Sequence, residues 1–258
     1  MNKILLSFDV EEFDIPREYG AEVSEQDEIA VSAAGLEPVL DLLEAKKVTA
    51  TFFVTAVFAE RAPGLFARIV SGGHEIASHG LRHTGFEIGD LAESKRILER
   101  LSGCRVTGFR AARLAPVPAE EIGRYYDYDS SLNPTFLPGR YNNLNKPATV
   151  FREPCGLLRC PVSVTPLARF PLFWLSFKNL PLGPYCLLAG AALSHYGFFS
   201  LYTHPWEYNA AIRDPRWKLP KYIVRHAGGE QLDRLGVLID RLGSKGEFTT
   251  FNSYLREF

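Results

Sequence analysis

The sequence predicts a mixed α/β fold in which parallel strands alternate with helices. Short apolar runs such as 50–54 are followed repeatedly by stretches whose apolar residues recur at helical spacing. The length of 258 residues is also sufficient for a full hydrophobic core within one domain. Repeated strand–helix units place the strands parallel to one another, either closed into a barrel or left as an open sheet.

The first strands and helices follow from local patterns. An unbroken apolar run predicts a buried strand at 4–8, and β-branched and aromatic residues predict another at 50–54. Apolar residues every three or four positions predict helices at 33–46 and 63–71. The glycine pair at 72–73 ends the second of these helices.

The same patterns continue along the chain. A helix at 90–102 should direct Leu91, Ile97, Leu98 and Leu101 inward. The other elements expected here are strands at 74–78, 106–110, 126–130, 198–204 and 247–251, and helices at 119–125 and 229–243.

The stretch 134–195 differs from the rest because it is rich in proline and aromatic residues and shows little periodicity. We interpret it as an irregular insertion within a single domain of residues 1–258, and we expect 134–184 to form part of a substrate-binding wall. Lys178, Asn179 and several prolines interrupt its longest apolar run, which therefore cannot form an unbroken membrane helix. A weak contact with a membrane surface remains an alternative for this run.

Composition argues against several classes of protein. The net charge is −1 without a basic block, which argues against a nucleic-acid partner. Met1 leads directly into a strand without a signal segment, so we expect a cytoplasmic protein. The four cysteines form no CxxC pair and are expected to be reduced and mostly buried, with a Cys155–Cys160 disulfide as the alternative. The oligomeric state is left open.

Polar residues follow the ends of several expected strands. His79 and His83 are four residues apart, so on a helical turn their rings would share one face and could bind one cation. The acidic cluster Asp9, Glu11 and Glu12 follows the first strand and can supply a third ligand. Two histidines and a carboxylate, with room left for water, are a common arrangement for hydrolytic zinc.

Together these residue types can supply the electrophile, the base and the acid that hydrolysis of an amide requires. A metal ion polarises the carbonyl group and lowers the pKa of water, and a carboxylate not bound to the metal can accept the proton of that water. Asp9 and Glu11 lie on the same side of an extended strand, and Asp9 is expected to be the base because it is closer to Arg110. Arg110 would keep the base ionised, and His204 could donate a proton to the leaving amine.

The segments that hold these residues resemble the ordered motifs of polysaccharide deacetylases, which are metal-dependent carbohydrate esterases. The matching segments are SFDVE (7–11), ATFFV (50–54), GHEIASHGLRH (73–83), GFRA (108–111) and LYTHPW (201–206). The resemblance implies a distorted (β/α) barrel of about seven parallel strands and the removal of an N-acyl group from a sugar. It also implies one divalent metal ion, for which zinc is the first candidate and Co²⁺, Ni²⁺ or Mn²⁺ are the alternatives.

Site residues can be carried over from this resemblance one by one. The resemblance implies that Asp9 is the base, oriented by Arg110, and that His204 is the acid, tuned by Asp129. The implied metal ligands are Glu11, His79 and His83. The family usually has adjacent aspartates in place of the Asp-Val-Glu spacing, which leaves open a swap of the roles of Asp9 and Glu11.

The sequence departs from the family at two further places. Ala111-Ala112-Arg113 replaces a proline-rich segment, and Ser130-Ser131-Leu132 lacks the usual trailing Asp-Trp. We expect substrate contacts from Trp206, Glu12 and Arg113, with packing as the alternative role for Trp206.

The leading hypothesis is a metal-dependent deacylase for an N-acylated sugar or cell-surface glycan precursor, with acetyl as the first candidate for the acyl group. The first alternative is an amidohydrolase acting on a non-sugar amide or a cyclic ureide. A non-catalytic carbohydrate-binding protein is disfavoured because both proton-transfer residues, Asp9 and His204, are present. A glycosidase with Asp9 and Glu12 as paired carboxylates would leave the histidine pair unexplained.

Overall fold

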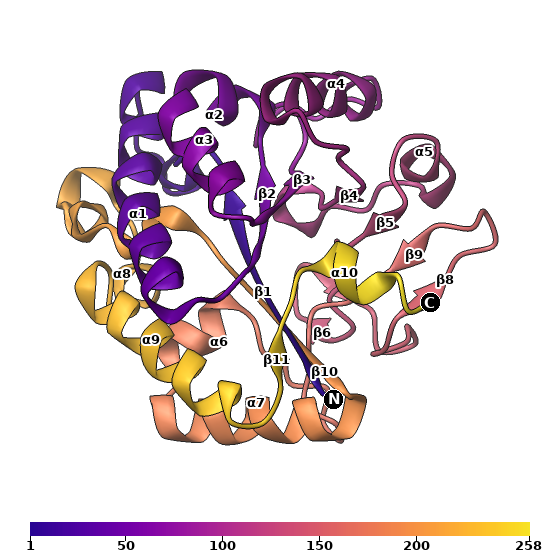
Figure 1. Cartoon of the computed structure of the whole chain (residues 1–258). Coiled ribbons are helices and arrows are strands. Elements are labelled where there is room, and N and C mark those ends of the chain that lie inside the picture. Colours follow the sequence, from indigo (N-terminus) through magenta and orange to yellow (C-terminus); the bar gives the residue numbers. More distant parts are fainter.

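Seven parallel strands lie side by side in the computed structural model, which describes residues 1–258 (Figure 1). Each strand in this row pairs in parallel with the next. Their order is β10 (Phe198–Thr203), β1 (Lys3–Val10), β2 (Thr51–Val54), β3 (Glu75–Ser78), β4 (Gly108–Phe109), β5 (Tyr128–Asp129) and β9 (Leu158–Arg159). The distorted barrel expected from the resemblance is thus confirmed.

The barrel closes through a few hydrogen bonds and not through a continuous ladder. Beyond β9, the amide N–H of Ser163 donates to the carbonyl of Ser200 in β10 (3.2 Å), and the Ser200 N–H donates to Ser163 Oγ (2.8 Å). The remaining strands lie at the margins. They are β8 (Phe151–Arg152), antiparallel to β9, β11 (Glu247–Phe248), beside the start of β1, and the hairpin β6 (Phe136–Leu137) with β7 (Tyr141–Asn142).

Helices surround the outside of the curled sheet (Figure 1). Ser24 begins the longest of them by accepting a hydrogen bond from the N–H of Asp27, as a helix N-cap does. The helices are α1 (Glu25–Lys46), α2 (Ala56–Arg61), α3 (Pro63–Ser71), α4 (Asp90–Ser102), α5 (Ala119–Gly123), α6 (Trp174–Asn179), α7 (Leu182–Tyr196), α8 (Lys221–Val224), α9 (Gly229–Gly243) and α10 (Phe251–Leu255). Five 3₁₀ helices complete the chain: η1 (Ile15–Tyr19), η2 (Ala112–Leu114), η3 (Pro205–Tyr208), η4 (Ala210–Arg213) and η5 (Pro215–Trp217).

Alternation along β1 decides which side chains face the barrel interior. Phe8 and Val10 join the large core between sheet and helices, whereas Leu5 belongs to the smaller cluster inside the barrel. Because side chains alternate along a strand, Ser7 and Asp9 share the inward direction of Leu5. Phe251 of α10 covers the opposite end of the interior, where its N–H donates to Thr51 at the start of β2. The polar end of the interior is therefore the end at which the parallel strands finish.

The main corrections to the predicted elements concern helices. Helix α1 begins at Glu25 instead of residue 33, helix α2 was not predicted, and Leu101 of α4 is exposed. The expected last strand ends at Phe248, and Phe251 instead begins α10. Tertiary packing decides these boundaries, which local periodicity defines poorly.

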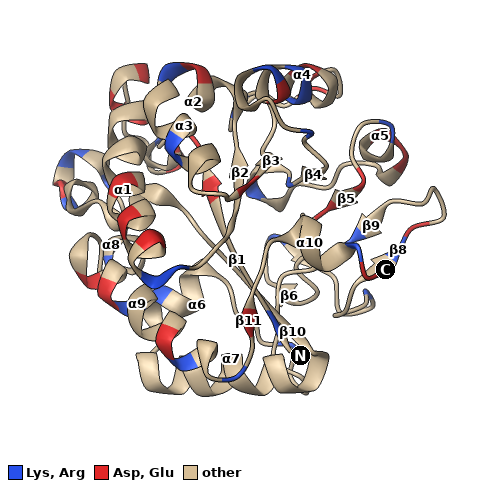
Figure 2. Cartoon of the chain, viewed as in Figure 1, with Lys and Arg blue, Asp and Glu red and all other residues tan.

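The insertion 134–195 is less irregular than predicted, because α6 and α7 lie within it. Helix α7 has no Asp, Glu, Lys or Arg, whereas α1, α4 and α9 carry charges on their outer faces (Figure 2). A helix without a polar face lacks the periodic signal from which helices are predicted. No helix in the chain is both long and apolar enough to cross a membrane.

The cysteines also differ from the expectation. All four are free, and Cys104 and Cys155 are exposed, so the thiols are not mostly buried.

The approach of α1 to η3 can be tested at Gly35. A Cβ atom at this position would lie 1.9 Å from the carbonyl oxygen of Pro205. Gly35→Ala should therefore lower the free energy of unfolding by about 2 kcal/mol or more, as overpacking does, in urea titrations. Gly64→Ala in α3 is the matched control, because its Cβ would meet no atom within 4 Å. A Gly35→Ala protein as stable as the control would contradict this close packing.

Candidate metal centre and active site

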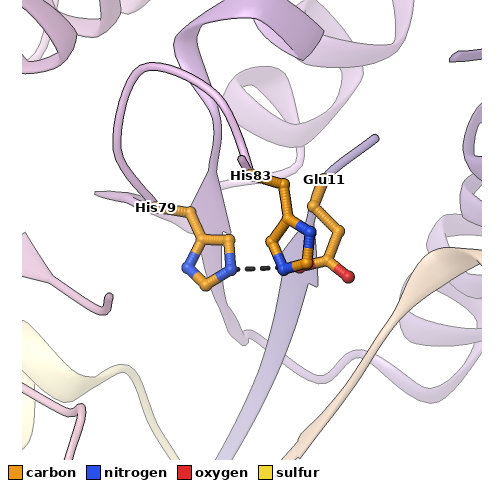
Figure 3. A group of neighbouring side chains, drawn as sticks. All are labelled: Glu11, His79 and His83. Atoms are coloured by element: carbon orange, nitrogen blue, oxygen red, sulfur yellow. Dashed lines mark hydrogen bonds and ion pairs between the residues drawn. The ribbon is translucent and has the colours of Figure 1, made fainter. Parts of the chain in front are cut away.

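Three side chains meet where β1 and β3 end (Figure 3). Glu11 directly follows β1, and His79 directly follows β3. One ligand atom from each of Glu11, His79 and His83 lies within 4.8 Å of the others, and all three residues are buried. The Nε2 atoms of both histidines are 3.0 Å from Glu11 Oε2. The residues expected to bind metal are therefore neighbours in the folded chain.

The two histidines do not lie on a helical turn as predicted. The segment from His79 to His83 is a loop, in which Gly80 has a φ of +90° that favours glycine. The two rings are nearly parallel, with centroids 5.7 Å apart. They converge because the loop folds back, and not because of helical periodicity.

Hydrogen bonds at Nδ1 leave the Nε2 atom of each histidine available as a ligand. His79 Nδ1–H donates to the backbone carbonyl of Arg110 (2.8 Å), and His83 Nδ1–H donates to Asp14 Oδ1 (2.6 Å). In the neutral rings, two Nε2 lone pairs then face one carboxylate oxygen of Glu11. Such a convergence of lone pairs requires positive charge between them, so this donor set fits a divalent metal ion.

Charges around the cluster favour the ionised form of Glu11. Burial acts to raise the pKa of Glu11, but His83, His204 and His79 outweigh it and hold the pKa well below its usual range. Trp206 Nε1–H also donates to Glu11 Oε1 (3.1 Å), which fixes the carboxylate from the other side. Glu11 is thus available as an anionic ligand.

Asp14 is buried beside His83. Its second oxygen accepts a hydrogen bond from Arg113 Nη2 (3.1 Å). Burial would lower the pKa of His83, but Glu11 and Asp14 outweigh burial and raise it. Asp14 therefore orients the His83 ring, a role that nothing in the local sequence indicated.

Asp9 is held apart from the histidine cluster by Arg110. Arg110 Nη1 donates to Asp9 Oδ1 (2.5 Å) and to Ser7 Oγ (2.9 Å). Its Nη2 donates to Ser130 Oγ (2.9 Å), and its guanidinium lies over the ring of Phe53. This placement is the one expected for an oriented base, with Glu11 and not Asp9 at the histidine pair.

His204 follows β10 and faces the same cluster. Its Nε2 is 3.9 Å from Glu11 Oε1, and its Nδ1 is 3.0 Å from Glu207 Oε1. Its ring stacks on Trp206 with centroids 4.8 Å apart. Burial acts to lower the pKa of His204, but Glu11 and Glu207 outweigh burial and raise it. The ring is therefore disposed to carry a proton.

The structure corrects the interpretation of Asp129. Its carboxylate accepts hydrogen bonds from Arg159 and Ser131, and Glu207 is the acidic partner of His204 instead. The position of Glu207 three residues after His204, where one short helical turn could bring it back, was an available signal that sequence reasoning left unused.

Two expected substrate contacts are also corrected. Glu12 is buried, accepts a hydrogen bond from Thr55 Oγ1 (2.8 Å) and does not line the cavity. Trp206 lines the cavity, but it is only 1% exposed, and His204 covers one face of its indole. Arg113 does line the cavity, where Glu18 and Asp14 hold its guanidinium.

A cavity of about 310 Å³ opens above the cluster. Asp9, Glu11, His79, His83 and His204 line its floor. Its walls come from the β6–β7 hairpin, the start of α6, η1 and α8, and include Leu137, Arg140, Tyr141, Trp174, Tyr19 and Tyr222. Part of the segment 134–184 thus borders the cavity that holds His79.

Fold and site together define an α/β barrel protein with a Glu–His–His site of the kind found in metal-dependent hydrolases. Comparisons with known proteins narrow this class. Residues 27–115 match the model of the polysaccharide deacetylase family. A chitooligosaccharide deacetylase of Sinorhizobium fredii is 47% identical over 45 residues, which are 17% of this chain and 21% of that protein. The aligned stretch thus spans about a fifth of the curated relative.

Solved structures match over nearly the whole chain. A probable polysaccharide deacetylase from Pseudomonas aeruginosa PAO1 has a TM-score of 0.71 at 16% identity, covering 98% of this chain and 89% of that one. The Puue allantoinase has a TM-score of 0.70 at 17% identity, covering 98% and 89%. At these identities the likeness shows a shared fold. The family match is a similarity to polysaccharide deacetylases over residues 27–115, about a third of the chain.

The donor set predicts one divalent ion per chain. Glu11→Ala and His83→Ala should each abolish stoichiometric metal in elemental analysis, because two remaining ligands bind an ion poorly. Asp14→Asn should retain the site but weaken zinc affinity by about 10–100-fold, since it changes only the partner of His83. Full metal content in either alanine variant would contradict the ligand assignment.

Proposed function

We propose that this protein is a metal-dependent deacylase that hydrolyses the amide bond of an N-acylated sugar unit in a glycan or glycan precursor. The observation that carries the proposal is the presence of three separate groups at one cavity floor. They are the Glu11–His79–His83 cluster, the Asp9–Arg110 pair and the His204–Glu207 pair. An amide hydrolase needs an electrophile, a base and an acid, and each group suits one of these roles.

Glu11, His79 and His83 would hold the metal ion, with zinc as the first candidate. When bound, the ion would polarise the amide carbonyl and lower the pKa of water. Asp9 would take the proton of the attacking water, because its carboxylate lies outside the ligand cluster. Arg110 holds this carboxylate in position, because its guanidinium is fully buried and bonded to Asp9 Oδ1.

His204 would protonate the leaving amine. Its Nδ1–H is held by Glu207, so its Nε2 is the atom that faces the cavity floor. Protonation of the nitrogen is required because an amine anion is a poor leaving group. Glu207 beside Nδ1 acts to raise the pKa of His204, which favours the protonated form that a general acid needs.

The walls of the cavity favour a sugar over a compact substrate. Tyr19, Tyr141 and Trp174 are partly exposed aromatic side chains along the cavity. Aromatic faces can pack against the apolar face of a sugar ring, and Tyr hydroxyls or Arg140 can bond its hydroxyl groups. These contacts lie on the cavity walls above the floor. A small ureide would contact only the floor. Hydrolysis of a cyclic ureide is kept as the second candidate because an allantoinase shares this fold.

Substrate class can be decided by a release assay. The zinc-loaded protein should liberate acetate or formate from N-acetyl chitooligosaccharides or other N-acyl sugars, and the release should stop with a chelator. Allantoin is tested in parallel under the same conditions. Turnover of allantoin without turnover of any N-acyl sugar would replace the proposed function by the second candidate.

The proposed role of Asp9 predicts a loss of activity without a loss of metal. Asp9→Asn should keep the metal and lower kcat by about a hundredfold or more, the usual scale for a general base. Asparagine retains an oxygen that accepts the hydrogen bond of Arg110, so the fold should be preserved. Loss of metal together with activity in Asp9→Asn would instead make Asp9 a ligand.

His204→Ala should also keep the metal and lose activity. A general acid works in its protonated form, so the rate of the wild-type protein should fall as pH rises through the pKa of His204. Glu207, which also raises the pKa of His204, lies on the side of the ring away from the metal cluster, so it favours the protonated ring. The variant should lack this alkaline limb in its pH–rate profile, and an unchanged limb would exclude His204 as the acid.

A further inference from the structure

A lysine without access to solvent lies behind His204. Lys178 is on α6, and both its side chain and that of Glu207 are 0% exposed. Lys178 Nζ is 3.2 Å from Glu207 Oε2. The other oxygen of Glu207 accepts hydrogen bonds from the backbone N–H of His204 (2.9 Å) and from its Nδ1–H (3.0 Å). A chain of three buried groups thus leads from α6 to the cavity floor.

Stability alone explains this lysine poorly. A buried ion pair seldom stabilises a fold more than an apolar pair of similar volume, because removing both charges from water is costly. Burial lowers the pKa of Lys178, and only the neighbouring Glu207 opposes this effect. Lys178 Nζ also has no hydrogen bond of good geometry, so its contact with Glu207 is mainly electrostatic. Its position directly behind the partner of His204 points to a role in the site.

The same helix contacts His204 at a second point. Trp174, four residues before Lys178, packs edge-on against the His204 ring with centroids 5.1 Å apart. Residues four apart share one face of a helix, so α6 presents both side chains toward the acid. Trp206 covers the face of the same ring. Packing confines the plane of the imidazole, and Glu207 selects which nitrogen points to the floor.

We propose that Lys178 is a positioning residue that acts through Glu207 to hold the His204 ring in its working orientation. Lys178 Nζ lies 3.2 Å from one oxygen of Glu207, so the attraction between them fixes the carboxylate whose other oxygen accepts from Nδ1–H of His204. A hydrogen bond to a charged acceptor is about twice as strong as one between neutral groups. The Nε2 atom of His204 then points toward Glu11 and the substrate. Proton delivery from Nε2 rests on the proposed function, whereas the hold on the ring does not.

Lys178→Met tests the proposal, because methionine matches the length of the aliphatic chain without its charge. The zinc-loaded protein should retain its metal, while kcat on N-acetyl chitooligosaccharide falls at least about tenfold and KM changes less than about twofold. Hydrolysis of 4-nitrophenyl acetate should fall less, because 4-nitrophenolate leaves without a proton from His204. Lys221→Met is the matched control, since Lys221 is an exposed lysine on α8 with no hydrogen bond or ion pair. Lys178→Arg should restore part of kcat by restoring the charge.

Proton NMR provides a readout that needs no substrate. The Nδ1–H of His204 should give a downfield resonance, assigned by its loss in His204→Ala. Lys178→Met should shift or broaden this resonance, and Lys221→Met should leave it unchanged. An unchanged resonance, or an unchanged kcat, in folded Lys178→Met would overturn the proposal.

A double variant keeps the proposal testable if Lys178→Met fails to fold. Lys178→Met/Glu207→Gln removes both buried charges and should restore folding without restoring the resonance or kcat. Recovery of both in the double variant would reduce Lys178 to a structural partner of Glu207. If the wild-type protein hydrolyses none of the probes, the proposed function fails on them, and the resonance alone decides the role of Lys178.

Discussion

The buried guanidinium of Arg110 is the contact on which the rest of the cavity floor depends. Its side chain holds Asp9 and Ser7 of β1 and Ser130 beyond β5, while its backbone carbonyl orients His79. Arg110, directly after β4, therefore positions both the Asp9 carboxylate, which would act as base, and the His79 ring of the histidine cluster. A fully buried cation is tolerated there because four of its hydrogen bonds are satisfied and Phe53 covers its face. Loss of Arg110 would leave Asp9 as a buried charge without a partner.

Three buried carboxylates lie next to histidines at this end of the barrel. Glu11, Asp14 and Glu207 are all buried, and each contacts a histidine. Carboxylates next to imidazoles fix the tautomer of each ring, which decides whether Nε2 is a ligand or a proton donor. The opposite end is closed by Phe251, packed between Phe53 and Tyr128. Aromatic packing thus closes one end of the interior, and histidine–carboxylate contacts lie at the other.

The segment 134–195 lines part of the cavity and also contacts the His204–Glu207 pair. Its β6–β7 hairpin borders the cavity with Tyr141, while α6 contacts His204 through Trp174 and reaches Glu207 through Lys178. A change in this segment could therefore alter substrate fit and proton transfer together. That connection gives a physical reason for such a long insertion beside a compact barrel.

The sequence by itself determined the parallel α/β fold and most of the floor. Apolar strands and amphipathic helices such as α3, α4 and α9 carry periodic patterns, and the HxxxH pair with the acidic strand end indicated the metal cluster. These signals are local, so they can be recognised without knowing the fold. Local signals failed for α7, whose uniform apolarity leaves no period, and for the loop geometry of His79 to His83.

Only the tertiary structure determined which group accepts the hydrogen bond of each histidine ring. Asp14 reaches His83 across 69 positions of the chain, and Lys178 meets Glu207 from a different element. Asp129, which the resemblance placed beside His204, is instead bound to Arg159, because β9 lies next to β5 in the barrel. The physical reason is that strand order and packing determine long-range pairing of buried charges, whereas sequence spacing constrains only residues a few positions apart.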